Sequence, residues 1–388
     1  MQISDSVKYV GVDDHKVDLF EGQFEVPNGM SYNSYVILDE KTAVMDSVDE
    51  DFGDEWISNI KEAVGGRSPD YLVVQHMEMD HSANIKKFMD TFKEAKIVSS
   101  KMAFTMMKNY FGTDFAERQV VVAENSKLEL GKHTLSFIAA PNVHWPEVVM
   151  SYESSEGILF SADGFGKFGA LDSEGDAALE KWKDEARRYY FGIVGKFGSN
   201  VQAVLKKAAN LKIERICPLH GPVLSGDVSA YVSLYDIWSK YESEEDGILV
   251  AYTSVYGNTR KASLKLAEKL SEKGQKVVVH DLARDDIYEC LSDAFRFSKI
   301  VFASTTYNGD VFPAMRDFLF KLAERNLQNK TVAFIENGSW SPMAEKKMAS
   351  ILALCNGISI IEDKVSLRIS MKEENLAQME KVVEALSK

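Results

Sequence analysis

The sequence predicts two domains of different classes. Before residue 245, short apolar strands mix irregularly with helical patterns, which indicates an α+β domain of paired sheets with helices on both outer faces. After residue 246, strands and helices alternate regularly, which indicates an α/β domain with a doubly wound, five-stranded parallel sheet. An acidic cluster ending in glycine, YESEEDG at 241–247, separates the two patterns, and 388 residues exceed one ordinary domain. We therefore expect domains at 1–245 and 246–388.

The first domain is predicted from its apolar runs. Runs rich in β-branched residues, each short enough for a strand, lie at 34–39, 42–48, 71–75, 96–100, 119–124, 133–140, 147–153 and 157–163. Helical periodicity occurs at 54–64 and 83–95, and 182–211 is expected to be largely helical. A last strand is expected at 214–219, directly before His220.

Composition excludes several classes of partner. Asp and Glu total 59 against 45 Lys and Arg, a net charge of −14, whereas nucleic acids and anionic membranes require a basic face. The chain contains no stretch of about 18 apolar residues, and its N-terminus does not resemble a signal peptide. Cys217, Cys290 and Cys355 form no CxxC pair, so neither a disulfide framework nor a rubredoxin-type centre is encoded. We expect a cytoplasmic protein.

One hexapeptide, HMEMDH at 76–81, carries four potential metal ligands, His76, Glu78, Asp80 and His81. It lies where a buried strand gives way to a loop. Alternate side chains of an extended chain share a face, so the first three ligands are expected to point together, with the second histidine brought round by a turn. Met77 and Met79 are then expected to face the packing side. Carboxylates gathered in this way repel one another unless a cation binds between them.

Three further candidate ligands stand at the ends of expected strands. His144 follows the strand at 133–140 and a turn containing proline, Asp163 ends the strand at 157–163, and His220 ends the strand at 214–219. The complete candidate set is His76, Glu78, Asp80, His81, His144, Asp163 and His220. Such a set is too large for one four-coordinate ion but suits two ions that share a carboxylate. Because it offers no thiolate, it indicates a catalytic site for zinc, iron or manganese.

The second domain opens with a strand, a loop and a helix that suit an anion. GILVAYTS at 247–254 reads as a buried strand and runs into VYGNT, where Gly257 makes the turn. Backbone N–H groups and hydroxyls at this helix start can bind a single phosphate, and the lysine of a polyphosphate-binding loop is absent. Further strands are expected within 275–282, 299–315, 331–342 and 357–363.

The loops that follow three of these strands carry polar and aromatic residues. Flat rings such as Tyr256, Tyr307 and Trp340 beside a phosphate site suit a planar isoalloxazine. In order, TSVYGNT, STTYNGDVFPAM and ENGSW resemble the three FMN-binding loops of flavodoxins. The candidate flavin contacts are therefore Thr253, Ser254, Tyr256, Gly257, Asn258, Thr259, Ser304, Thr305, Thr306, Tyr307, Asn308, Gly309, Asn337, Gly338, Ser339 and Trp340.

The metal motif is similar to that of the metallo-β-lactamase-like fold, an αββα sandwich. Hydrolases of that fold usually carry HxHxDH, whereas Glu78 replaces the second histidine here. A carboxylate in place of an imidazole adds negative charge and a harder donor, which favours iron that cycles between ferrous and ferric states over hydrolytic zinc. A lactamase-like domain with this glutamate, joined to a flavodoxin-like domain, resembles the flavodiiron proteins, or A-type flavoproteins, along essentially the whole chain.

The resemblance implies an enzyme that reduces dioxygen to water, nitric oxide to nitrous oxide, or both, with FMN and two iron ions as cofactors. One iron would take His76, Glu78 and His144 and the other Asp80, His81 and His220, with Asp163 bridging. FMN can pass electrons singly to such a centre. Trp145, Tyr189 and Tyr190 are candidates for lining the site or delivering protons, with core packing as the alternative.

The resemblance also implies partners. We expect a head-to-tail homodimer, or a dimer of dimers, in which the neighbour's flavin serves the irons. The electron donor is expected to be a separate protein, rubredoxin, or else a reduced deazaflavin. Two other functions stay open. A zinc-dependent hydrolase with an appended flavodoxin domain would work without reductant, and a non-catalytic flavin electron carrier would tolerate the loss of His144 or Asp163.

Overall fold

The computed structural model describes residues 2–174 and 178–388, which form two compact units, Met1–Asp236 and Ile237–Lys388. Helix α8 (Val228–Ser239) contains the division, and the first strand of the second unit, β17, begins at Glu245. The domain boundary that the acidic cluster predicts near residue 245 stays a prediction. In the described part of the chain, no helix combines the length and apolarity needed to cross a membrane.

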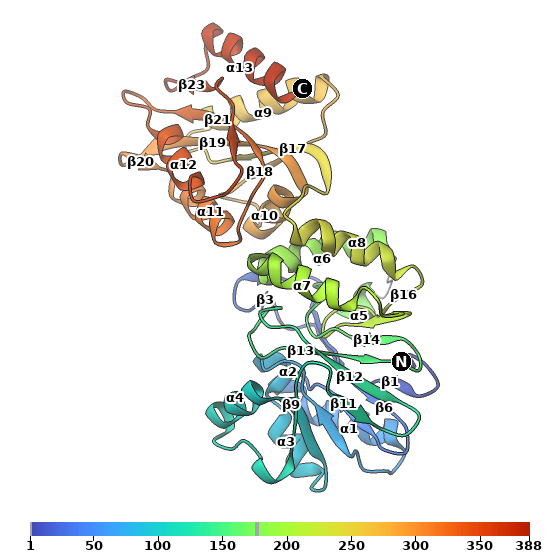
Figure 1. Ribbon diagram of the computed structural model, residues 1–388. Helices are drawn as coiled ribbons and strands as arrows, with labels where there is room; N and C mark the ends of the chain where they lie inside the picture. The colour runs from blue at the N-terminus through green and yellow to red at the C-terminus, as the bar shows by residue number, and fades with distance from the viewer. Residues whose placement is uncertain (1, 175–177) are drawn as a thin grey trace. The chain divides into compact units, whose positions relative to one another are not determined.

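The first unit contains two six-stranded sheets (Figure 1). The first sheet has the order β1-β6-β7-β8-β9-β10 and consists of β1 (Val7–Tyr9), β6 (Tyr35–Ile37), β7 (Ala43–Met45), β8 (Tyr71–Val73), β9 (Lys96–Ser100) and β10 (Gln119–Val122). The second sheet follows chain order and consists of β11 (Lys127–Glu129), β12 (Thr134–Ala139), β13 (Val149–Glu153), β14 (Ile158–Phe160), β15 (Arg215–Cys217) and β16 (Leu224–Ser225). Strand pairs β2 (Val12–Asp14) with β5 (Met30–Tyr32), and β3 (Leu19–Phe20) with β4 (Phe24–Glu25), stand apart.

The core of the first unit lies between these sheets. Side chains of both sheets form one buried apolar cluster, in which the ring of Tyr35 meets Phe160 edge-on at 5.5 Å between centroids. The Tyr35 hydroxyl donates to the Pro218 carbonyl over 2.7 Å, which satisfies its polar end. Removing this apolar surface from water is what holds the two sheets face to face.

Helices cover the outer faces of both sheets, so the predicted αββα sandwich is confirmed. Helix α1 (Gly53–Val64) contacts β6, α4 (Lys101–Phe111) contacts β9, and α7 (Gly198–Ala208) contacts β12. In α1 the buried residues Trp56, Ile57, Ile60 and Val64 recur at helical spacing, and Gly65 ends the helix in the left-handed conformation. The described part of this unit also contains the α-helices α2 (Met79–Ser82), α3 (Ile85–Thr91), α5 (Leu171–Glu174) and α6 (Leu179–Tyr189).

The second unit is the predicted doubly wound sheet, with strand order β18-β17-β19-β21-β22, and all these neighbours are parallel. Its main strands are β17 (Glu245–Tyr252), β18 (Val277–Asp281), β19 (Phe297–Tyr307), β21 (Thr331–Asn337) and β22 (Ser359–Ile360). A strand that the sequence did not predict, β23 (Val365–Leu367), pairs with the end of β21, and β20 (Asp310–Val311) turns back on β19.

Helices lie on both faces of this parallel sheet (Figure 1). One face carries α9 (Asn258–Glu272) and α13 (Glu373–Leu386), and the other carries α10 (Ile287–Arg296), α11 (Pro313–Glu324) and α12 (Ala344–Leu352). Central strands covered on both faces are continuously apolar, and residues 247–252 of β17 are all buried. The loops at the strand carboxyl ends therefore gather at one edge, where ligands of such sheets bind.

Candidate metal centre and flavin pocket

The hexapeptide is extended only in its first half. Strand β8 ends at Val73, Glu78 has extended backbone angles, and a single helical turn, α2, begins at Met79. The expectation that both methionines face the packing side is wrong for one of them, since Met77 is buried but Met79 is 41% exposed. The helical turn reverses the chain after Glu78, which directs Met79 outward.

Four of the predicted ligands surround one point. The Nε2 atom of His144 lies 2.9 Å from Glu78 Oε2 and 3.0 Å from Asp163 Oδ2. The Nε2 atom of His76 lies 3.3 Å from each of the same two oxygens and 3.4 Å from His144 Nε2. Two imidazoles and two carboxylates thus present their ligand atoms to a common centre.

The other three predicted ligands form a second group beside the first. The Nε2 atoms of His81 and His220 are 2.9 Å apart, and each lies 3.2 Å from Asp80 Oδ2. The second oxygen of Asp163, Oδ1, lies 3.4 Å from His81 Nε2 and 3.9 Å from His220 Nε2. One oxygen of Asp163 therefore faces each group, which is the arrangement of a carboxylate shared by two metal ions.

Two of the imidazoles are oriented by groups that the sequence did not reveal. His220 Nδ1 lies 2.7 Å from the Ser31 carbonyl oxygen, which can only accept, so Nδ1 carries the proton and Nε2 keeps its lone pair for a metal. His76 Nδ1 lies 2.9 Å from Glu147 Oε1, and this carboxylate also accepts from the backbone N–H of Met77. Glu147 stands only three residues after His144, yet nothing in its local sequence marks it as an orienting group.

A tight turn after β14 holds the shared carboxylate in place. The backbone N–H of Gly164 donates to Ser161 O over 3.0 Å, and Gly166 N–H donates to Asp163 O over 3.1 Å. A Cβ atom on Gly166 would lie 3.2 Å from Tyr189 Cε1, a tight contact that would require the ring to shift by a few tenths of an ångström. Glycine therefore lets the turn approach the aromatic ring while Asp163 points between the two ligand groups.

The electrostatics of these residues fit a pair of cations. Both oxygens of Asp80, both of Asp163 and Nδ1 of His81 are buried without a hydrogen-bond partner among residues 2–174 and 178–388. Burial alone would raise the pKa of Asp163, but His76, His144 and His81 together outweigh burial and hold this pKa well below its usual range. Buried acceptors that need positive charge, with no thiolate among them, suit two ions held by nitrogen and oxygen.

The candidate aromatic residues differ in their contacts. Trp145 meets the rings of His76 and His144 at centroid distances of 5.3 and 6.1 Å, and Tyr189 meets His220 at 5.6 Å. The ring contacts of Tyr190 are with Tyr235 and Phe191, which corresponds to the core-packing alternative. Two further rings, Phe20 and Tyr32, lie against His220 at 5.3 and 5.9 Å, and the sequence did not predict them.

The second unit has a cavity of about 440 Å³ at the carboxyl ends of β17, β19 and β21. Thirteen predicted flavin contacts line it, namely Ser254, Tyr256, Asn258, Thr259, Thr305, Thr306, Tyr307, Asn308, Gly309, Asn337, Gly338, Ser339 and Trp340. Thr253, Gly257 and Ser304 are not among the lining residues: Thr253 and Ser304 face each other behind it, with hydroxyl oxygens 2.9 Å apart. Four unpredicted residues also line the cavity, Val255, Ser341, Met343 and Ile369.

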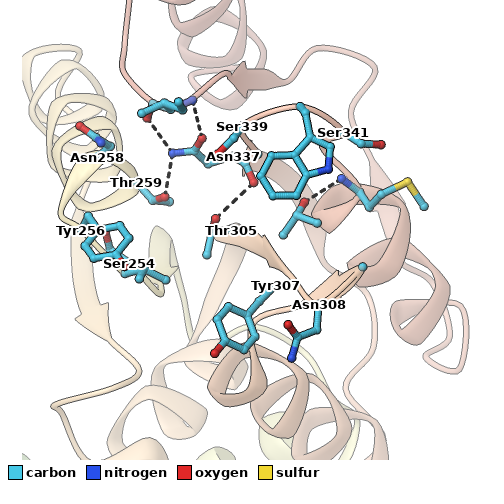
Figure 2. A pocket seen from close by; sticks show the side chains of 17 residues that line it. Ser254, Tyr256, Asn258, Thr259, Thr305, Tyr307, Asn308, Asn337, Ser339 and Ser341 are labelled. Carbon is cyan, nitrogen blue, oxygen red and sulfur yellow. Dashed lines mark hydrogen bonds between the residues drawn. The ribbon is translucent and has the colours of Figure 1, made fainter.

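The cavity combines an anion site with flat apolar surfaces (Figure 2). Helix α9 begins at its edge, and Gly257 precedes the helix with a φ of 85°, which only glycine adopts readily. Figure 2 shows the side chains of Ser254 and Thr259 near this helix start. Tyr256 and Trp340 are 92% and 85% exposed, an unusual state for large rings unless a ligand or partner covers them.

Comparisons with known proteins give the same two parts. The model of the ODP family beta lactamase matches residues 30–221, and that of the flavodoxin domain matches residues 249–381. A nitric oxide reductase of Moorella thermoacetica is 30% identical over 352 residues, covering 89% of this chain and 87% of that protein. An anaerobic nitric oxide reductase flavorubredoxin of Vibrio vulnificus is 26% identical over 390 residues, covering 98% of this chain and 77% of that protein.

The fold comparison extends over the whole chain. The crystal structure of the flavodiiron protein from Giardia intestinalis matches with a TM-score of 0.90 and 27% identity, and the match covers 100% of this chain and 95% of that one. The chain has a lactamase-like and a flavodoxin-like domain in the predicted order, and its seven candidate ligands lie in two adjacent groups. Its relatives match it along both domains. The chain belongs to the flavodiiron protein family.

Proposed function

We propose that this protein is an oxidoreductase that reduces dioxygen to water, nitric oxide to nitrous oxide, or both, at a non-haem di-iron centre supplied with electrons through FMN. The observation that carries the proposal is the pair of ligand groups that share Asp163, in a chain that also has a flavin pocket. Hydrolysis needs no flavin, whereas the reduction of a diatomic gas needs a source of electrons.

The proposed ligands of the two irons follow the two groups. His76, Glu78 and His144 would hold one iron, Asp80, His81 and His220 the other, and Asp163 both. When bound, the irons would bind and polarise the diatomic substrate and transfer electrons to it. The protein's own contribution is orientation and exclusion: Glu147 and the Ser31 carbonyl fix the rings of His76 and His220, while surrounding aromatic rings keep bulk water away.

Glu78 is the residue that most separates this site from a hydrolytic one. Two histidines beside it hold the pKa of its carboxyl at about 2 despite burial, so it is an anion at every working pH. With Asp80 and Asp163 it would bring three carboxylates to the two irons. Negative ligands stabilise the ferric more than the ferrous state, which suits a centre that must give up electrons.

The proposed flavin contacts divide by chemistry. Hydroxyl and backbone N–H groups of residues 254–259 would bind the phosphate, as the start of α9 favours an anion there. Tyr256, Tyr307 and Trp340 would cover the ring system. When bound, FMN would accept electrons from the donor and release them singly.

The electron donor is proposed to be a separate rubredoxin, with a reduced deazaflavin as the second choice. The cysteines Cys217, Cys290 and Cys355 offer no CxxC pair for a built-in iron centre, and the Vibrio relative carries the name flavorubredoxin. A head-to-tail homodimer, or a dimer of dimers, is proposed from the family resemblance. Exposed Tyr256 and Trp340 support a partner surface at the flavin.

One experiment tests the function directly. The protein would be purified anaerobically, analysed for metal and flavin, reduced, and mixed separately with dioxygen and nitric oxide while flavin reoxidation is recorded. We expect two irons and one FMN per chain and reoxidation far faster than that of free FMN with at least one gas. Zinc in place of iron, with reoxidation no faster than that of free FMN, would identify a hydrolase and refute the proposal.

A further inference from the structure

Ile369 has a backbone conformation that its side chain disfavours. Its φ is +68°, in the left-handed region, where a β-branched residue clashes with its own backbone. The residue follows β23, outside the three loops that resemble those of flavodoxins, yet it lines the flavin pocket and is 54% exposed. Such a conformation persists only where surrounding groups impose it, and it is concentrated at binding sites.

The group that imposes it is the side-chain amide of Asn337. Its Oδ1 accepts from the Ile369 backbone N–H over 3.0 Å, and its Nδ2 donates to the Ile369 carbonyl oxygen, also over 3.0 Å. One buried amide therefore fixes both backbone polar groups of Ile369. Two further bonds join the same segments, from Gly338 N–H to Leu367 O and from Arg368 Nη1 to Trp340 O, both 3.1 Å.

The same amide reaches the start of α9. Asn337 Nδ2 also donates to Thr259 Oγ1 over 3.3 Å. Because a hydroxyl has one proton, a Thr259 oxygen that accepts from Asn337 keeps its own proton free for another acceptor. Thr259 lies in the first turn of α9, where an anionic ligand would be the natural acceptor.

We propose that Asn337 is a positioning residue of the flavin site, which clamps residues 367–370 as a fourth flavin-binding segment and orients the Thr259 hydroxyl toward the phosphate. In this segment Ile369 supplies an apolar contact to the bound flavin. The inference rests on the proposed flavin site and adds two features to it: a segment beyond the three expected loops, and a role for Asn337 that acts through its neighbours.

The test is a double-mutant cycle on FMN affinity, measured by quenching of flavin fluorescence in apoprotein. Asn337→Ala is expected to weaken FMN binding at least about tenfold, since it removes three hydrogen bonds that shape the site. Adding Ile369→Gly to that variant is expected to recover part of the loss, because glycine adopts a positive φ without a clamp, while the Ile369 contact and the Asn337–Thr259 bond stay lost. Ile360→Gly, at an exposed isoleucine of β22 outside the pocket, is the matched control and should recover nothing.

Two results would overturn the inference: unchanged FMN affinity in Asn337→Ala, or a loss that Ile369→Gly fails to rescue. A second measurement does not depend on flavin. Hydrogen exchange of the Ile369 amide in flavin-free protein should be slow in the wild type and fast in Asn337→Ala, and equal rates would refute the clamp. A wild-type protein that shows this protection but binds no FMN would refute the flavin site instead, so the two failures are distinguishable.

Discussion

The metal centre and the flavin pocket are built in opposite ways. The seven candidate metal ligands are largely buried, and they come from four segments far apart in the sequence, at residues 76–81, 144, 163 and 220. The flavin pocket lies at the tips of loops, with two large rings almost fully exposed. The metal centre thus has its ligands assembled by the core, whereas the flavin pocket offers surfaces that a ligand completes.

This difference determines how much function or ligand affinity a substitution removes. At the metal centre buried carboxylates and imidazoles balance one another, so losing one leaves others without their partner. At the flavin pocket a lost ring removes only contact area from the bound state. We therefore expect large, coupled effects at the metal centre and small, separable effects at the exposed rings of the flavin pocket.

The largest effect is expected from Asp163→Ala. Both ligand groups lose the shared carboxylate, so we expect a fall in gas reduction of roughly two orders of magnitude or more and iron below two per chain. FMN content should stay at the wild-type level. Iron and flavin analysis with oxygen and nitric oxide turnover would check this, and a variant with full turnover would refute the di-iron assignment.

Glu147→Gln is expected to have the next largest effect. The carboxylate that fixes His76 Nδ1 is replaced by a neutral amide, and loss of such an orienting group typically lowers metal affinity by about 10- to 100-fold. The measurement is iron retention against a chelator.

Glu153→Gln is the matched control for that variant. Glu153 is equally buried, at the end of β13, but it pairs with His133 and accepts from the backbone N–H of Ser155 instead of contacting a candidate metal ligand. Its replacement should lower stability and leave iron retention unchanged. Equal iron loss in both variants would show that burial of a carboxylate, and not orientation of His76, is what matters.

In the metal-free protein, the metal centre and the flavin pocket should also respond differently to pH. Burial opposes protonation of His144, but Asp163 and Glu78 overcome it and raise its pKa to about 9. Because this is above the unfolded value of about 6.5, the stability that His144 contributes is fully present below about pH 6.5 and is lost as the pH rises through 9. Metal binding displaces the same proton, so affinity should rise in that window, by up to about tenfold per pH unit.

Thermal unfolding and iron(II) binding of metal-free protein at pH 6.5 and pH 9 would check both slopes. The unfolding midpoint is expected to fall and the affinity to rise over this interval. FMN binding to the second unit should show no matching trend. A midpoint that rises together with affinity would contradict the assigned charge state of the site.

The same contrast explains what the sequence could predict. Each candidate metal ligand lies in a segment that follows an apolar strand, so its place after a strand is visible in the local pattern, and the structure gathers the seven in two groups. The groups that orient them are not visible, because Glu147 reaches His76 from 71 residues away and the partner of His220 is a backbone carbonyl, which any residue could supply. Local sequence patterns therefore indicate the candidate ligands, whereas the groups that orient these ligands are determined by tertiary contacts.

The flavin pocket shows a second limit. The three loops carry recognisable residues, but Ile369 lies in a short segment after β23 that no local signal marks as a ligand site. The predicted direction of the Met79 side chain was wrong for a related reason. Side chains alternate between two faces only while the chain stays extended. Alternation therefore stops predicting side-chain direction at Met79, where the extended chain changes to a helical turn.

The smallest effect is expected from Trp340→Ala. The ring is 85% exposed, so it contributes little to the fold and its stacking on a bound flavin is the main interaction lost. One aromatic contact of about 0.5 to 1.5 kcal/mol corresponds to roughly two- to tenfold weaker FMN binding. Flavin titration would measure this, with Leu354→Ala as an exposed apolar control away from the pocket. Iron content and the unfolding midpoint of flavin-free protein should not change, whereas a lower midpoint with unchanged FMN affinity would mean that Trp340 supports the fold and that the flavin pocket is as fully built as the metal centre.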